Sequence, residues 1–284
     1  MDLLEYGGSL IQSLLTELLS TAIAIPLVTY LVLKFFQNFR SARIWDVSGR
    51  IRQVFRPRPY PTLVLSTSSI YSGDARYSRP QTGIGQIRSL ALFGSSLSRA
   101  YRADPDDRRI LLSHECRISQ GELTEDLIVI GGPKTNEIGL LLLKELAPRL
   151  PEGFSFAPET VSIRGKDTHT FALRFEGRLL QPSNDDEVVG LVLRTSNPLS
   201  PERTLTYVAG LGTYGTEAAA RALLECTELH RPAPLAFRWW KWRFGGRPNA
   251  YLAIIRAHLT GNQADSTPRS AVSPRVVNYT RLAS

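Results

Sequence analysis

The chain has 284 residues and a formal charge of +8, with 34 basic and 26 acidic side chains. Its two cysteines, Cys116 and Cys226, are too few for a disulfide framework in a chain this long, and no CxxC pair or Cys/His cluster indicates structural zinc. These features exclude a small disulfide-stapled secreted protein, favour a reduced compartment and predict no metal site. No nucleic-acid recognition motif accompanies the positive charge, so anionic lipid is the favoured partner for it.

Residues 15–36 form one apolar segment, and Leu18–Leu33 within it carries no charge. Roughly 20 helical residues cross a hydrocarbon core of about 30 Å. We therefore predict a short tail over residues 1–14, a transmembrane helix over 15–36 and the lipid bilayer as a partner. A buried core helix or an interfacial helix is the alternative, and Pro26 supports it, although membrane helices tolerate proline.

The charges that flank this segment predict its orientation. Acidic residues precede it, whereas the flank after it is basic, with Lys34, Arg40, Arg43, Arg50, Arg52, Arg56 and Arg58. The positive-inside rule predicts a single-pass protein of the cell membrane with its N-terminus outside and its main domain in the cytoplasm. The acidic start does not fit a cleaved signal peptide.

Residues 37–60 are predicted to be a basic juxtamembrane connector. Its apolar residues recur at helical spacing between arginines, namely Ile44, Trp45, Val47, Ile51, Val54 and Phe55. This pattern is typical of an amphipathic helix that lies on a membrane surface, with Trp45 at the interface. A helix that packs on its own domain fits the pattern equally well.

An α/β domain is expected over residues 61–260. Residues 62–69 are predicted to be a short strand followed by a loop of small hydroxyl residues. Further apolar runs predict strands over 109–112, 126–130, 160–163, 170–175, 187–194, 204–209 and 250–258. Helical patterns cover 84–101, 137–146 and 216–228, and the core positions expected in the first are Ile84, Ile87, Leu90, Leu92, Leu97 and Tyr101. Residues 261–284, rich in Ser, Pro, Arg and Asn, are predicted to be a disordered tail.

Strands that alternate with helices indicate βαβ units, whereas residues 153–196 lack a helix and suggest an antiparallel excursion. The predicted fold class is α/β, a Rossmann-like, mixed and mostly parallel sheet preceded by one transmembrane helix.

Three predicted strands run into turns of small residues, and ligands of open α/β sheets bind at such strand ends. Backbone amides and helix N-termini there favour anions. The candidate ligand-binding residues are Ser66, Ser68 and Ser69 in the first turn; Gly131, Gly132, Lys134 and Asn136 in the second; and Gly210, Gly212, Thr213, Gly215 and Thr216 in the third. Two structural alternatives stay open, namely that Asn136 caps the next helix and that the glycines only permit tight turns.

The third turn matches GxGxxG by letter but lacks the acidic residue expected about 20 positions later, and GxxxxGK[ST] is absent. Gly212–Glu217 resembles the PGGxGTxxE signature of the "lonely guy" phosphoribohydrolases and of the nucleotide-binding superfamily around them. Leu211 and Thr213 depart from that signature, and Ala219 stands where the family has its glutamate. Because that glutamate serves catalysis in the family, the resemblance implies nucleotide binding rather than N-glycosidic cleavage.

The other candidate site residues each have a simpler structural explanation. His114 and Cys116 share one side of a strand end, next to Ser113, and Asn184–Glu187 is either a solvated charge run or a metal site. The loop after the first predicted strand contains Tyr71, Asp74, Arg76 and Tyr77. These side chains could cover a bound ligand, or the loop could be an ordinary surface loop. Residues 237–244, rich in Trp and Arg, suit a membrane interface, a stack on a nucleobase or an edge strand.

The leading prediction is a membrane-anchored domain that binds a nucleotide or a nucleotide-derived phosphate as a sensor or effector. An effector role would need a homo-oligomer, because one span cannot form a pore. The rival predictions are an enzyme that cleaves or transfers an N-glycosidic bond, with Asp74, Glu137 or Glu217 as its carboxylate, and a ligand-free scaffold. The sequence identifies neither a cofactor nor a catalytic residue.

Overall fold

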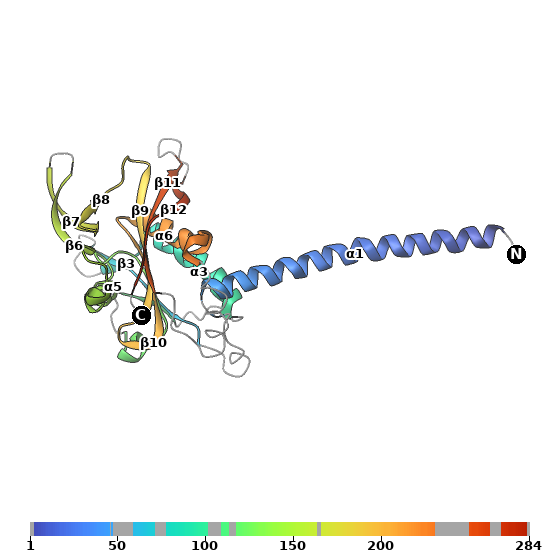
Figure 1. Cartoon of the computed structure of the whole chain (residues 1–284), viewed down its shortest axis with the longest axis horizontal. Helices are drawn as coiled ribbons and strands as arrows, with labels where there is room; N and C mark the ends of the chain where they lie inside the picture. The colour runs from blue at the N-terminus through green and yellow to red at the C-terminus, as the bar shows by residue number, and fades with distance from the viewer. Residues whose placement is uncertain are drawn as a thin grey trace.

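A long helix leaves one side of a mixed α/β domain (Figure 1). The computed structural model describes residues 3–45, 47, 59–71, 78–101, 109–113, 118–163, 166–230, 250–261 and 268–282. Helix α1 (Leu3–Ile44) has 42 residues and unites the predicted span with the first part of the predicted connector. Its segment Ala22–Ile44 is long and apolar enough to cross a membrane, with a mean hydropathy of 1.5 and none of the tested window buried.

The main sheet has seven strands in the order β12-β11-β9-β10-β5-β1-β4. Strands β1 (Thr62–Leu65), β4 (Ile110–Leu112), β5 (Leu127–Ile130) and β10 (Ser200–Gly210) run parallel to one another. Strands β9 (Glu187–Asn197), β11 (Tyr251–Thr260) and β12 (Ser270–Arg281) add an antiparallel half. The predicted mixed sheet is confirmed, but three of its six pairings are antiparallel, so it is not mostly parallel.

Other elements cover both faces of this sheet (Figure 1). One face packs against α3 (Ile84–Tyr101), α6 (Thr213–Glu225), η3 (Thr227–His230) and the end of α1. The other carries α5 (Glu137–Leu146), η2 (Ala147–Arg149) and an antiparallel sheet of β6 (Ser155–Ile163), β7 (Lys166–Phe175) and β8 (Arg178–Leu180). Strands β2 (Ser68–Tyr71) and β3 (Ser78–Gln81) pair separately, and α4 (Gln120–Leu123) precedes β5.

Two hydrophobic cores result, one on each face. In β5, Ile128 and Ile130 enter the core under α3 and α6, whereas Leu127 and Val129 enter the core under α5. This follows from the two-residue period of a strand. Because both faces are covered, the strand reads as an unbroken apolar run rather than an alternating one.

Helix α3 has the predicted limits, but its predicted core face is only partly correct: Leu90, Leu97 and Tyr101 contribute to the core under α6. Ile84 and Ile87 are 48% and 45% exposed, and Leu97 alone of the six predicted core residues is fully buried. The buried residues are Gly85, Gln86, Ser89, Phe93, Ser96, Leu97 and Ala100. Small residues face α6 because the two helices approach closely there: a Cβ at Gly85 would lie 1.8 Å from the carbonyl oxygen of Thr213.

The prediction of a disordered tail is also wrong over much of its length. Ser270–Arg281 forms β12, which pairs with β11 along its length. Ala271 is fully buried within the core under α6. The composition concealed this strand because Pro274 and polar residues interrupt its apolar ones, which an edge strand tolerates. The domain therefore extends beyond residue 260.

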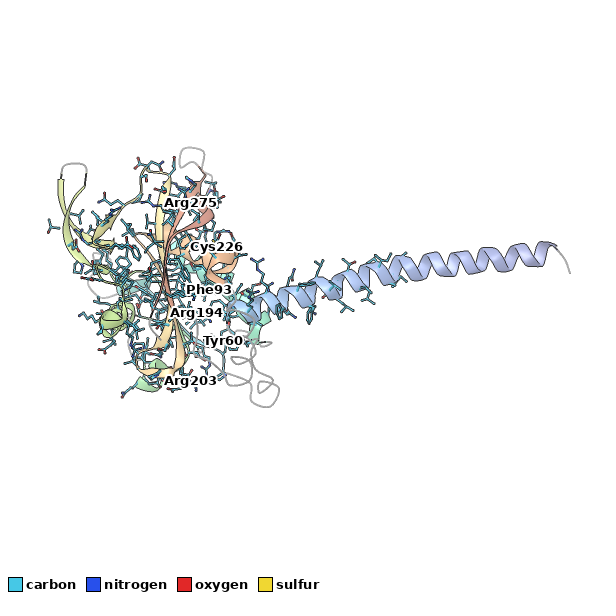
Figure 2. The ribbon with its side chains drawn as sticks, in the orientation of Figure 1. Tyr60, Phe93, Arg194, Arg203, Cys226 and Arg275 are labelled. Atoms are coloured by element: carbon cyan, nitrogen blue, oxygen red, sulfur yellow. The ribbon has the colours of Figure 1, made fainter. Side chains whose placement is uncertain are left out.

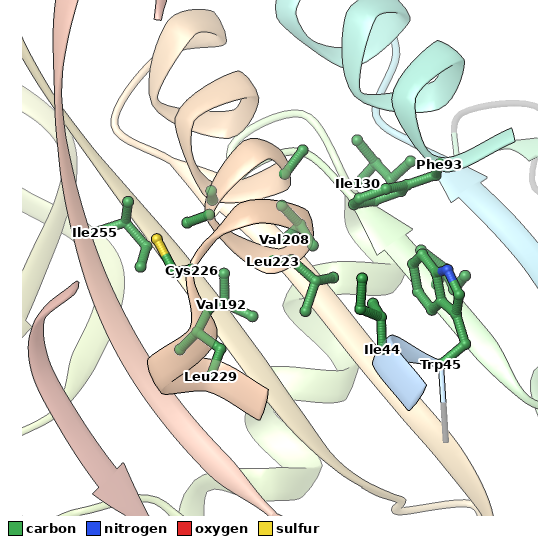
Figure 3. Close-up of a cluster of buried hydrophobic side chains, with 14 of the residues drawn as sticks. Ile44, Trp45, Phe93, Ile130, Val192, Val208, Leu223, Cys226, Leu229 and Ile255 are labelled. Atoms are coloured by element: carbon green, nitrogen blue, oxygen red, sulfur yellow. The ribbon is translucent and has the colours of Figure 1, made fainter. Parts of the chain in front are cut away.

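The end of α1 is embedded in the domain (Figures 2 and 3). Trp45 is 5% exposed, lies edge-on to Phe93 with 5.2 Å between ring centroids, and donates a hydrogen bond of 2.9 Å from Nε1 to Ser96 Oγ. Arg194 donates from Nη1 to the carbonyl oxygen of Ile44. The placement of Trp45 at a membrane interface is therefore wrong, and the alternative of packing on the chain's own domain holds for Ile44, Trp45 and Val47. Ile51, Val54 and Phe55 lie outside the described residues.

Candidate functional site

The carboxyl ends of β1, β4, β5 and β10 lie at one edge of the sheet, here called the carboxyl edge. Leu65 is in register with Ile130 and with Leu112, and Ile130 is in register with Val208. The amide of Ser66 donates to Ile130 O over 2.9 Å, and the amide of Gly131 donates to Val208 O over 2.8 Å. The three predicted turns therefore begin side by side at this edge.

The first turn is buried at its start and is hydrogen-bonded to the second turn. Ser66 is 2% exposed, and its Oγ would lie 2.1 Å from a Cβ at Gly131, whose φ of +111° favours glycine. The amide of Thr67 donates to Thr135 O over 3.1 Å. Ser68 and Ser69 continue into β2, in register with Gln81 and Pro80. These contacts fasten the first turn to the second.

The second turn has one structural residue and one exposed cation. Asn136 is fully buried, accepts the amide of Gly139 over 2.9 Å and donates to Ile130 O over 3.3 Å. The capping alternative for Asn136 is therefore confirmed. A Cβ at Gly132 would lie 3.2 Å from Gly210 O, which places the second turn against the third. Lys134 is exposed.

The glycines of the third turn have different roles. Gly210 and Gly215 pack against each other, since a Cβ at Gly210 would lie 2.3 Å from the carbonyl carbon of Gly215. Gly212 is exposed, and a Cβ there would meet no atom within 4 Å. It is the N-cap of α6 and provides no side-chain cap. Thr216 is 1% exposed, one turn into the helix.

Thr213 joins this turn to a fourth segment that sequence reasoning missed. Its Oγ1 accepts the amide of Gly85 over 2.7 Å and donates to Gln86 Oε1 over 3.0 Å. Gln86 is 7% exposed, and its Nε2 would lie 3.5 Å from a Cβ at Gly131. The signal that could have found this segment is the pair of small residues Thr82 and Gly83, which immediately precede α3.

The surface that a ligand could touch is smaller than the predicted set. Ser66, Gly131, Asn136, Gly210, Gly215 and Thr216 are buried, whereas Lys134 and Gly212 are exposed and Gly132 and Thr213 are half-buried. Tyr214 is also half-buried, and Glu137, the first residue of α5, is exposed. The start of α6 brings a positive dipole end and amides without a side-chain cap to this surface.

Glu217 lies away from that surface. It is fully buried, and its carboxylate accepts hydrogen bonds from Arg88 Nη1 over 3.0 Å, Arg221 Nη2 over 3.1 Å and Ser270 Oγ over 2.7 Å. It thereby ties α6 to α3 and β12. Ala219 packs against Gly190, with 3.0 Å between its Cβ and the position of a Cβ there. Asp74, another carboxylate of the enzyme alternative, lies outside the described residues.

The remaining chemical candidates are structural or undescribed. Ser113 is buried, and its hydroxyl donates a hydrogen bond of 3.1 Å to Thr135 O. The other candidates lie outside the described residues, namely His114, Cys116, Arg76, Tyr77, residues 237–244 and the side chain of Tyr71. Burial raises the pKa of the Cys226 thiol to about 11, as do Glu228 and Glu225 nearby. Glu187 pairs with Arg256 over 2.5 Å, and Asp186 with Arg269 over 3.2 Å. Within the described parts of the chain, no group of three His, Cys, Asp or Glu side chains could hold a metal ion.

A cavity of about 500 Å³ opens beside the third turn, between β7, β8 and the loop before β9. Apolar side chains form one wall, among them Phe171, Leu180 and Leu211. Gln181, Asn184 and Asp185 add polar groups. Leu211 immediately precedes Gly212, so this cavity and the start of α6 lie on the two sides of one turn. When the chain is compared with protein-family models and with curated protein sequences, neither comparison finds a match.

Proposed function

We propose that this chain is a membrane-anchored, Rossmann-like domain that binds a nucleotide or a nucleotide-derived phosphate ligand. The observation that carries the proposal is the uncapped N-terminus of α6 at the carboxyl edge of the sheet. Two other helices have a side-chain N-cap, since Asn136 caps α5 and Ser119 caps α4. A bound phosphate would supply α6 with the negative acceptor that those side chains supply elsewhere.

The residues around α6 favour a ligand larger than phosphate. Lys134 is exposed on the turn next to Gly210 and would add a point charge. The cavity beyond Leu211 offers an apolar wall and amide groups, which suit a ribose and a planar base. The resemblance of Gly212–Glu217 to the "lonely guy" signature favours a nucleotide over other phosphate esters.

Helix α1 supports the membrane anchor. Its exposed face is almost wholly apolar over 17 residues, from Ile23 at 66% to Phe39 at 46% exposed. Lys34, the one charge within that stretch, holds its Nζ 5.5 Å from the centroid of the Tyr30 ring, and its long stem would reach the headgroups. The basic flank after the span favours an orientation with the domain in the cytoplasm and the N-terminus outside the cell membrane.

The proposal also explains why the ligand site and the anchor lie at opposite ends of one helix. Helix α6 begins at Gly212, and near its other end Leu224 O accepts a hydrogen bond of 2.8 Å from Arg40 of α1. A ligand that rigidifies the start of α6 would thus act on an element fixed to the anchor, as a membrane sensor or effector requires.

The test is a thermal-shift measurement on the full chain in lipid nanodiscs, since α1 and β12 both contribute to the domain core. A nucleotide that binds the native state should raise Tm. Gly212→Asp would place a carboxylate at the open N-cap, so it should raise Tm without ligand and abolish the nucleotide shift. Gly212→Asn is the matched neutral control, which caps the helix and should reduce the shift less. If no nucleotide shifts Tm, or if Gly212→Asp leaves the shift intact, the proposal is wrong.

A further inference from the structure

A second cavity, of about 440 Å³, lies where α1 meets the domain. We call it the junction cleft. It lies between the last turns of α1 and the segment that ends α6 and forms η3. Its polar lining residues are Arg40, Arg43, Glu225, Thr227, Glu228 and His230.

The charges of the junction cleft are separated by element. Both cations come from α1, whereas Glu225 and Glu228 come from the end of α6 and from η3. Burial lowers the pKa of His230 to about 4, so His230 is neutral at physiological pH and adds no cation. The cleft therefore presents two positive and two negative groups on opposite walls.

Backbone contacts hold the two guanidinium groups in place. Arg40 Nη2 donates to Leu224 O over 2.8 Å, and Arg43 Nη2 donates to His230 O over 2.8 Å. A guanidinium carries five N–H donors, so one such contact does not exhaust it. Glu225 remains half exposed, 3.8 Å from Arg221. All four charged groups are exposed to an incoming polar ligand.

The position of the junction cleft along α1 identifies the kind of ligand. Arg40 immediately follows Phe39, the last exposed aromatic residue of the apolar stretch. Arg43 follows Arg40 by three positions along the helix, a rise of about 4.5 Å. If the hydrocarbon core ends at Phe39, Arg40 and Arg43 lie about 1.5 and 6 Å beyond it, within the headgroup layer of roughly 5–8 Å on that side.

We propose that the junction cleft binds the headgroup of a zwitterionic phospholipid with a primary ammonium, of the phosphatidylethanolamine type. The lipid phosphate would contact Arg40 and Arg43, and the ammonium would contact Glu225 and Glu228. This inference rests on the proposed membrane anchoring, but not on the proposed nucleotide site.

Charge and hydrogen bonding separate this ligand from other lipids. A purely anionic headgroup would satisfy the arginines but would bring negative charge toward two carboxylates. A choline headgroup has the same charges as ethanolamine, yet its trimethylated nitrogen has no N–H to donate. Charge-assisted hydrogen bonds to both carboxylates are available only to the primary ammonium.

The experiment compares the full chain in nanodiscs of phosphatidylethanolamine with nanodiscs of phosphatidylcholine, at matched acyl chains and a constant fraction of phosphatidylglycerol. We expect Tm to be about 2 to 4 °C higher with ethanolamine, a shift that a modest gain in stability produces in a domain of this size. The double variant Glu225→Gln/Glu228→Gln should abolish the difference. The control Glu145→Gln/Glu152→Gln changes two exposed glutamates on the far side of the sheet and should preserve it.

Four outcomes would overturn the inference. Equal Tm values in the two lipids would exclude recognition of the ammonium. In a second series that varies the phosphatidylglycerol fraction, a Tm that follows only this fraction would indicate an anionic lipid. The same stabilisation by inorganic phosphate in detergent would indicate a simple anion site. Release of the chain from membranes by carbonate would reject the anchor as well, whereas a nucleotide shift that persists in detergent would leave the site at α6 standing.

Discussion

The hydroxyl of Thr213 accepts a hydrogen bond of 2.7 Å from the amide of Gly85, which joins the first residue of α6 to the first turn of α3. The two residues are 128 positions apart in the chain. Thr213 thus supplies an acceptor to an amide of α3, where helices have no internal partner. This contact stabilises α3, whereas the start of α6 stays open at the carboxyl edge because its N-cap, Gly212, has no side chain.

This contact predicts a measurable loss of stability. Thr213→Val keeps the shape of the side chain but removes the hydroxyl, and it should cost about 1 kcal/mol, the usual value of a helix cap. Thr213→Ser retains the hydroxyl and should cost less. Urea unfolding followed by circular dichroism measures both. Equal losses in the two variants would show that the hydroxyl contributes nothing.

The buried end of α1 predicts that the domain depends on Trp45. Trp45→Ala should reduce the free energy of unfolding by roughly 3–5 kcal/mol, because it empties a core position and leaves Ser96 without this donor. Phe35→Ala is the control, since Phe35 is 67% exposed on the same helix. Thermal unfolding in detergent checks the pair, and similar Tm values for both variants would contradict the docking of α1.

Glu217 predicts a local as well as a global effect. Its buried carboxylate neutralises Arg88 and Arg221 and accepts from Ser270, so Glu217→Gln should cost about 3 kcal/mol. The loss should appear first as faster amide hydrogen exchange in β12, which Ser270 begins. Glu145→Gln, at an exposed site on α5, should leave this exchange unchanged. Slow exchange in β12 of the Glu217→Gln variant would refute the predicted role.

Because His230 is buried in its neutral form, the free energy of unfolding should fall in acid. Burial lowers the pKa of His230 to about 4, the contact with Leu223 O opposes this, and the positive charges of Arg194, Arg43 and Arg40 lower the pKa further. A depressed pKa means that the unfolded chain binds the proton more readily, so the contribution is fully present above about pH 6.5 and is lost as the pH falls toward 4. The loss should be about 3 kcal/mol.

Urea unfolding between pH 7 and pH 4 tests this, with His230→Gln as the variant that should flatten the dependence. His258→Gln changes an exposed histidine and should leave the dependence intact. If the wild type and His230→Gln lost stability in parallel, the acid sensitivity would arise elsewhere.

Elements with strong local signals were predicted well. The limits of Ile84–Tyr101 and Glu137–Leu146 agree with α3 and α5, and Asn136 caps α5 as its position suggested. Each of these features is determined by neighbours along the chain, such as apolar periodicity and a capping side chain. The absence of a helix between residues 153 and 196 likewise predicted the antiparallel strands β6 to β9.

The errors concern contacts between distant segments. The periodicity of α3 could not show that small residues would face α6, because only the closeness of the two helices makes them the buried side. The sequence left open whether Trp45 lies at a membrane or packs on the domain, because its partner Phe93 is remote in the chain. The β12 segment was predicted to be disordered, since its contact with α6 joins Ser270 to Glu217, 53 positions apart. No local pattern identified Gln86 as a residue of the carboxyl edge. Glu217 was predicted as a candidate catalytic carboxylate, but Arg88 and Ser270 contact it in the folded protein and it is buried.

The sequence by itself determined an apolar helix, its basic flank, most strands and the three small-residue turns, because propensity, patterning and capping act over a few residues. Only the tertiary structure decided which turn residues are buried, which helix start stays open and where α1 ends in the domain. Those properties depend on surfaces that meet after the chain has folded, and no local pattern records the partner.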